Sequence, residues 1–350
     1  MTSKTINQSA AQAAPFGVRR TVNVMMRNRA YSLLMVCALS GTSLAAAEKR
    51  AEGAIGSSQQ NKISTLQYWT LERMKEAERE ENQDGDTPIS GPILTPGGDD
   101  QGHAQLPQPY TQQLISRVTG QLFFLEPVSE KNKHCTASVL QSQSKRLIIA
   151  AAHCFMAATL HPPLQWNQRL MFVPAYDGNR PVTDNLRAPY GLWPISRSYV
   201  SADLEEDPGL AFRIDHDLGV AGVFDQLSAR IEEVVGGGFA PFINDGSELL
   251  PLVNMLGYPA KGRYLGATQY WCLSTTQTDV PALGLPNCKD RHGHSGGPIL
   301  LVNDASLPLE ATQIVGVVHG GSQTRLLPDL YPAIGEMANR DHQHDGGLAP

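Results

Sequence analysis

Short apolar runs separated by turn residues dominate the chain from residue 116 onward. Each run has strand length, and most are rich in Val, Ile, Leu or Phe. The runs are Gln121–Leu125, Thr136–Leu140, Leu147–Ala152, Leu218–Val223, Leu252–Tyr258, Pro298–Val302 and Ile314–Val318. No long amphipathic helical pattern interrupts the series. The pattern therefore predicts an all-β domain, a sandwich or a pair of barrels, over about 220 residues.

A leader precedes this domain. Ala30–Leu44 is apolar and uncharged, follows two arginines and precedes three alanines, which is the pattern of a secretory signal peptide. The run is shorter than the ~20 residues that a bilayer span needs. We expect residues 1–47 to be a signal region, with Met25 or Met26 as alternative starts. The protein is then secreted or periplasmic and keeps no stable membrane anchor after signal cleavage.

A different segment lies between the leader and the domain. From Thr70 the stretch Ser64–Asn82 has helical spacing of apolar residues, and ten of the 29 residues of Asn82–Tyr110 are Gly or Pro. The aromatic residues beside the helix are costly to leave in water. We expect residues 48–113 to be a docked helical prosegment with a linker. Residues 114–335 then form the domain and 336–350 a polar tail, where His342 and His344 are solvated.

The net charge and the cysteine count narrow the functional class and the cellular compartment of the protein. A net charge of −6 argues against a nucleic-acid-binding protein. The leader carries +5 and residues 48–110 carry −5. Of five cysteines, Cys37 leaves with the leader, and an exported protein with four remaining cysteines is expected to form two disulfides. Three pairings are open from the count alone, among Cys135, Cys154, Cys272 and Cys288.

Three short segments carry the chemistry. They are Leu147–Cys154 (LIIAAAHC), His216–Val220 (HDLGV) and Gly293–Pro298 (GHSGGP). Hydrolysis by a serine nucleophile requires a base that takes its proton and a carboxylate that orients the base. A glycine-rich turn lets main-chain N–H groups point at a developing oxyanion. The segments supply these groups in the order His, Asp, Ser.

These segments resemble the motifs of the chymotrypsin/trypsin-like serine endopeptidases, most closely the bacterial secreted branch that includes glutamyl endopeptidases. The likeness covers roughly residues 115–325. It implies a double six-stranded antiparallel β-barrel and protein or peptide substrates. It further implies a base His153, an orienting acid Asp217, a nucleophile Ser295 and an oxyanion hole from Gly293 and Ser295. The implied disulfides are Cys135–Cys154 and Cys272–Cys288.

Departures from the family pattern affect activation and specificity. Trypsin has an aspartate before the serine that pairs with a new N-terminus, whereas His294 stands here, so we expect that switch to be absent. His292 and His294 are expected to line or support the cleft. Residues resembling the specificity pocket of glutamyl endopeptidases predict a preference for an acidic side chain before the scissile bond. They are Lys289, His319, Gly320 and Gly321.

Several alternatives remain open from sequence. Asp215 competes with Asp217, because strand alternation places both on one face, although the family pattern favours Asp217. The serine motif also reads as the G-x-S-x-G elbow of an α/β-hydrolase-type esterase, which needs a helix after the serine. A non-catalytic protease-fold binding protein is the third reading. No metal-ligand spacing or cofactor motif stands out, and oligomeric state is not readable.

Overall fold

A computed structural model describes residues 54–56, 61–79, 88–89, 91–157, 159–181, 183–245, 250–279, 282–302, 313–320 and 323–343. The predicted signal region with Met25, Met26 and Cys37 lies outside these ranges, as do Gly321 and His344. Among the described residues, no helix is long and apolar enough to cross a membrane.

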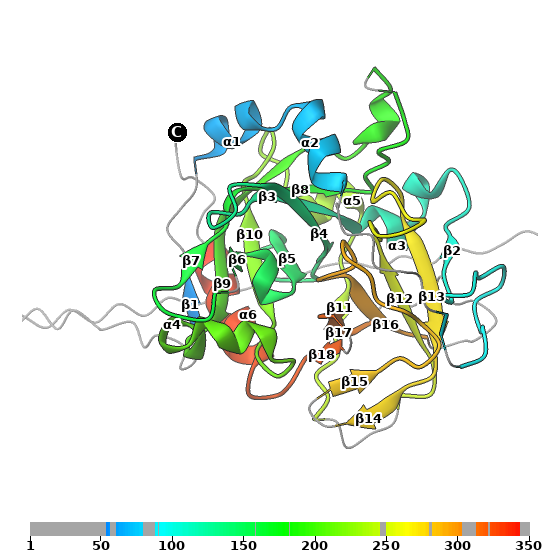
Figure 1. Cartoon of the computed structure of the whole chain (residues 1–350). Helices are drawn as coiled ribbons and strands as arrows, with labels where there is room; N and C mark the ends of the chain where they lie inside the picture. The colour runs from blue at the N-terminus through cyan, green and yellow to red at the C-terminus, as the bar shows by residue number, and fades with distance from the viewer. Residues whose placement is uncertain are drawn as a thin grey trace, which may run out of the picture. The chain divides into compact units, whose positions relative to one another are not determined.

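The first sheet closes into a six-stranded barrel (Figure 1). Its strand order is β1-β9-β10-β5-β4-β3-β8, and an additional pairing of β8 with β9 closes the ring and leaves β1 outside. All of these pairings are antiparallel. The strands are β1 (Ala54–Gly56), β3 (Thr119–Leu125), β4 (Asn132–Val139), β5 (Leu147–Ala150), β8 (Gln168–Pro174), β9 (Trp193–Ser201) and β10 (Gly219–Val223).

The second sheet follows the path β14-β15-β18-β17-β16-β12-β13-β2, with β11 beside β17, and this path stays open over the described part of the chain. Its strands are β2 (Ala104–Gln105), β11 (Ala240–Pro241), β12 (Val253–Gly257), β13 (Tyr270–Ser274), β14 (Gln277–Asp279), β15 (Ala282–Gly284), β16 (Pro298–Leu301), β17 (Gln313–Val318) and β18 (Gln323–Arg325). The all-β prediction is confirmed, with one closed barrel and one half-barrel in place of two closed barrels. A separate hairpin joins β6 (Met156–Ala157) and β7 (Gln165–Trp166).

Two short helices precede the barrels and pack on the first one. They are α1 (Lys62–Tyr68) and α2 (Leu71–Glu78), and the Thr70 hydroxyl caps α2 as its sequence predicts. Trp69 and Met74 are buried against Phe123 of β3. The segment therefore packs on the first barrel, and its role as a prosegment stays a prediction. Its buried surface includes Glu78, whose carboxylate accepts a hydrogen bond from the Tyr176 hydroxyl.

The remaining helices are short turns, apart from the last one. They are α3 (Leu114–Arg117), α4 (Asp203–Glu206), α5 (Ile231–Val235) and α6 (Tyr331–Gln343), with 3-10 turns η1 (Tyr110–Gln112), η2 (Ala152–Cys154), η3 (Asn185–Arg187) and η4 (Pro208–Phe212).

The structure differs from the expected polar tail at α6. This helix packs against β9 and β10 of the first barrel (Figure 1). His342 is buried beside the hydroxyl of Tyr199, and Asp341 binds Arg197 and Tyr199. The polar residues of the helix therefore bind polar residues of β9, which a pattern of apolar residues does not reveal.

Candidate active site

His153 lies in the turn that follows β5. The strand ends at Ala150 and η2 carries the imidazole to the edge of the barrel, where its side chain is 24% exposed. A disulfide between Cys135 and Cys154 ties this turn to β4, with the two Cα atoms 6.0 Å apart. The ring is therefore accessible from solvent while its main chain is fixed.

Asp217 lies next to this ring, just before β10, and is fully buried. Its Oδ2 accepts a hydrogen bond from His153 Nδ1 at 2.7 Å, and its Oδ1 accepts one from the His153 main-chain N–H at 2.9 Å. Burial alone would raise the pKa of Asp217, but the two imidazoles of His153 and His319 outweigh it and lower the pKa to about 2. The carboxylate is thus ionised at neutral pH and fixes the orientation of His153.

Asp215 has different partners. Its carboxylate pairs with Arg213 at 2.7 Å and with His216 at 3.0 Å. It lies in a turn before β10, so strand alternation does not apply to it. Of the two candidate acids, Asp217 is the one that contacts His153.

Ser295 lies in a glycine turn that precedes β16 of the second sheet. Gly293 has φ +81°, and a Cβ there would lie 2.2 Å from a main-chain oxygen, so the turn requires glycine at this position. Thr136 of β4 holds the turn from the first barrel, because its hydroxyl donates to Gly293 O at 2.7 Å and its N–H to Ser295 O at 2.9 Å. Sequence reasoning did not assign Thr136 this role, although it adjoins Cys135.

The N–H groups of this turn fall into two sets. Those of His294, Gly296 and Gly297 donate to main-chain carbonyls. Those of Gly293 and Ser295 have no acceptor among the described residues. Two main-chain donors therefore flank the Ser295 side chain and are available to a developing negative charge.

The Ser295 hydroxyl donates at 3.5 Å to the main-chain oxygen of His319, and no hydrogen bond joins it to His153 within the described residues. The two turns are nevertheless adjacent, since Cys154 Sγ lies 3.7 Å from Ser295 O. Catalytic hydrogen bonds are often long before substrate binds. The arrangement brings the predicted base, acid and nucleophile to the same edge of the two sheets.

The residues expected in a specificity pocket do not all share one environment. Lys289 is half-buried in the loop before Ser295, and its main-chain N–H donates to Gln101 O at 3.0 Å. His319 directs its Nδ1 at Asp217 Oδ2, 2.5 Å away. Gly320 is exposed, and a Cβ there would lie 3.9 Å from Asp290 Oδ2. Gly321 is outside the described residues, so its place in a pocket stays a prediction.

The two other histidines of the serine turn have opposite exposures. His292 is exposed, whereas His294 is buried and contacts the ring of His103 with the centroids 4.8 Å apart. Burial lowers the pKa of His294 well below its ordinary value. His294 therefore supports the turn from the interior.

The second disulfide joins Cys272 and Cys288 with a Cα separation of 5.8 Å. Both pairings implied by the family resemblance are present. Cys288 lies one residue before Lys289, so this bond fixes the start of the loop that leads to Ser295.

One group of possible metal ligands coincides with the site. His153, Asp217 and His319 place their ligand atoms within 4.8 Å of one another. The hydrogen bonds of 2.7 and 2.5 Å to Asp217 already account for that closeness. Each of these nitrogen–oxygen distances is shorter than the distance between two ligand atoms that share a metal ion at ~2.0–2.1 Å.

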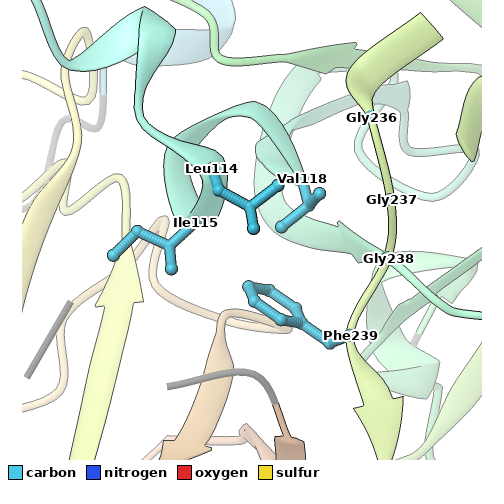
Figure 2. A pocket seen from close by; sticks show the side chains of 7 residues that line it. All are labelled: Leu114, Ile115, Val118, Gly236, Gly237, Gly238 and Phe239. Atoms are coloured by element: carbon cyan, nitrogen blue, oxygen red, sulfur yellow. The ribbon is translucent and has the colours of Figure 1, made fainter. Parts of the chain in front are cut away.

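A small apolar pocket lies elsewhere, between α3 and the loop before β11. Figure 2 shows the side chains of Leu114, Ile115, Val118 and Phe239 converging on it beside three glycines. Its cavity volume is about 60 Å³, well below the ~300 Å³ at which ligand pockets begin. It contains none of the residues above, so it is a packing gap between the segments.

The serine turn also bears on the esterase alternative. Ser295 is followed by the strand β16, whereas the nucleophile elbow of an α/β-hydrolase leads into a helix. The mostly antiparallel sheets likewise differ from a parallel hydrolase sheet. The structure therefore contradicts the α/β-hydrolase reading.

Comparison with solved structures agrees with this architecture. A thermostable serine protease, AL20, from an extremophilic microorganism aligns with a TM-score of 0.52 at 18% identity, over 66% of this chain and 99% of its own. The protease Anisep from Arthrobacter nicotinovorans aligns with a TM-score of 0.51 at 19% identity, over 65% of this chain and 96% of its own. No family model and no curated protein sequence matches the chain.

The two alignments cover nearly the whole length of each neighbour. Their sequence identities are low, so the likeness establishes the fold alone. The closed barrel, the half-barrel and the two disulfides are consistent with that likeness. The chain thus has the fold of the chymotrypsin-like serine proteases.

Proposed function

We propose that this protein is a serine endopeptidase that cleaves protein or peptide substrates with Ser295 as nucleophile, His153 as base and Asp217 as orienting acid. The observation that carries the proposal is the pair of acceptor-free N–H groups on Gly293 and Ser295, placed beside a serine whose neighbouring turn holds His153. Main-chain N–H groups in buried parts of a protein are normally hydrogen-bonded. Two N–H groups without an acceptor, on the buried Gly293 and the half-buried Ser295, are therefore better explained by a role in binding than by a structural one.

The reaction follows from these positions. His153 Nδ1 is held by Asp217, so Nε2 is the nitrogen that takes the Ser295 proton as Oγ attacks the carbonyl carbon. The N–H groups of Gly293 and Ser295 then bind the oxyanion. Collapse of the intermediate passes the proton from His153 to the leaving amine and leaves an acyl-enzyme. Water, deprotonated by His153, hydrolyses that ester and restores Ser295.

Labelling with a fluorophosphonate tests this function directly. The folded protein should take one label on Ser295 and hydrolyse peptides, and Ser295→Ala should remove the label and at least ~10³-fold of the rate. Ser129→Ala, on an exposed turn, is the matched control and should behave as wild type. A folded protein that takes no label on Ser295 would instead be the non-catalytic binding protein.

We extend the proposal to an acidic preference before the scissile bond. Its support is Lys289, which lies half-buried in the loop that leads to Ser295 and whose ammonium has no ion pair among the described residues. The measurement compares peptides that differ only in Glu, Gln or Arg at that residue. Glu should be cleaved fastest, and Lys289→Gln should lower the Glu:Gln ratio about tenfold. Equal rates for the three peptides would reject the preference.

Export is the last part of the proposal. Two disulfides form in oxidising compartments, which agrees with a periplasmic or extracellular location. We propose that residues 1–47 are the signal region. N-terminal sequencing of exported protein should begin after Ala47, and a start within the leader would exclude that boundary.

A further inference from the structure

A second imidazole shares the Asp217 carboxylate. His319 follows β17, and its Nδ1 lies 2.5 Å from Asp217 Oδ2, the same oxygen that His153 Nδ1 contacts at 2.7 Å. The two rings meet edge to face with centroids 6.1 Å apart. An ionised carboxylate only accepts hydrogen bonds, so both Nδ1 atoms carry hydrogen.

The surroundings of His319 favour its charged form. The side chain of His319 is half-buried and contacts the fully buried carboxylate of Asp217. Burial alone would lower the pKa of His319, but the bonds to Asp217 and Phe212 and the nearby Asp290 charge together raise it.

We propose, on the basis of the proposed function, that His319 is a positioning residue that holds Asp217 and, as a cation, opposes protonation of His153. The charged and titratable groups facing it are Asp217, His153 and Asp290. A positive charge on His319 would lie 6.1 Å from the His153 ring and would repel a second positive charge there.

Two variants separate the charge from the hydrogen bond. His319→Asn places an amide N–H near Nδ1 without a titrating group, and His319→Ala removes both. We expect the acid limb of kcat/KM to move to higher pH in both variants, because the repelling charge is removed. We expect kcat to fall less than about tenfold in the Asn variant and at least ten times further in the Ala variant.

An NMR titration of the His153 ring in the Ser295→Ala background measures the same shift without activity, so it remains informative if the proposed function fails. An acid limb and a ring titration unchanged in both variants would overturn the proposal. So would a change confined to the preference between Glu and Arg peptides, because that result assigns His319 to the pocket.

A separate observation concerns the segment before the domain. Residues 99–103 form a brace behind the serine loop: Lys289 N–H donates to Gln101 O at 3.0 Å, and His103 Nε2–H donates to Lys289 O at 2.5 Å. Gly102 approaches so closely that a Cβ would lie 2.1 Å from Asn287 O. The brace is therefore fitted to this loop at the level of the main chain.

The brace reaches the oxyanion turn through two buried rings. His103 packs on His294, the residue between the two acceptor-free N–H groups. Asp99 adds a hydrogen bond from the Tyr264 hydroxyl at 2.5 Å. Removal of the brace would expose His294 and free both main-chain groups of Lys289.

We infer that residues 99–103 position the oxyanion turn and stay in the active protease, so that cleavage after Arg117 is not its activation step. This inference rests on the proposed function, which the label on Ser295 tests independently. The experiment expresses the full chain, labels it with a fluorophosphonate, and determines the intact mass and N-terminal sequence of the labelled species. We expect a labelled chain that begins before residue 99. A labelled, fully active enzyme that begins after residue 103 and holds no cleaved fragment would overturn the inference.

Discussion

Acidification should destabilise this protein through the buried ring of His103. Its Nε2–H donates to Lys289 O, and its Nδ1 has no partner among the described residues, so the ring is neutral. Burial lowers its pKa from 6.5 to about 4. In the unfolded chain the ring gains a proton below about pH 6.5, whereas the folded chain gains it only near pH 4. Stability is therefore complete above pH 6.5 and falls as the pH decreases towards 4.

The loss of stability follows from the difference between the pKa of His103 in the unfolded chain and in the folded chain. Each pH unit over which only the unfolded chain holds the proton is worth about 1.4 kcal/mol, so His103 accounts for about 3 kcal/mol between pH 6.5 and 4. The assay is urea unfolding at pH 7, 5.5 and 4. His103→Gln keeps an amide donor for Lys289 O and does not titrate, so its stability should fall by about 3 kcal/mol less than that of wild type.

His161→Gln, on an exposed loop, controls for loss of a histidine as such. It should follow the wild-type pH dependence. If His103→Gln and wild type lose stability in parallel between pH 7 and 4, the reasoning from burial is refuted.

Three further predictions concern the loop and the segment before it. Gly293→Ala, with a Cβ 2.2 Å from a main-chain oxygen, should lower kcat at least ~10²-fold by displacing an oxyanion donor; an unchanged kcat would exclude that donor. Replacing Cys272 and Cys288 by serine opens a link across 16 residues and should cost about 3 kcal/mol in urea unfolding, and a cost below ~1 would show that the loop is held by other contacts. Glu78→Gln leaves the buried Arg187, 3.8 Å away, without its carboxylate and should destabilise by about 2–4 kcal/mol; a neutral result would mean that the Glu78–Arg187 pair contributes little to stability.

Strands with an uninterrupted apolar run were readable from sequence, whereas strands with buried polar residues were not. β5 and β17 lie within a residue or two of the predicted runs. β9 was missed because Ser196 and Ser198 are buried on it, and Ser196 satisfies its hydroxyl through Gly222 O. Helix α6 was missed for a related reason, since its polar residues are paired with β9 and so resemble a solvated tail.

The residues of the candidate site also differ in whether the sequence reveals them. His153 and Ser295 stand in local patterns, a strand followed by AHC and a glycine turn, which a sequence displays directly. Strand periodicity left Asp215 and Asp217 equivalent, whereas the family pattern favoured Asp217, and Asp217 is the one that contacts His153. The environment of His319 was not predictable, since its partner lies 102 positions away in the chain and only folding brings the second imidazole to the carboxylate.

Helix α6 has a consequence for the order in which the chain matures. It is the last described element, yet it packs against β9 and β10, and His342 fits against Gly222 where any side chain would collide. The barrel that carries His153 and Asp217 therefore lacks one packing partner until residues 331–343 are available. We therefore expect a chain truncated before residue 331 to be less stable in the barrel that carries His153 and Asp217, because β9 and β10 lose this packing partner.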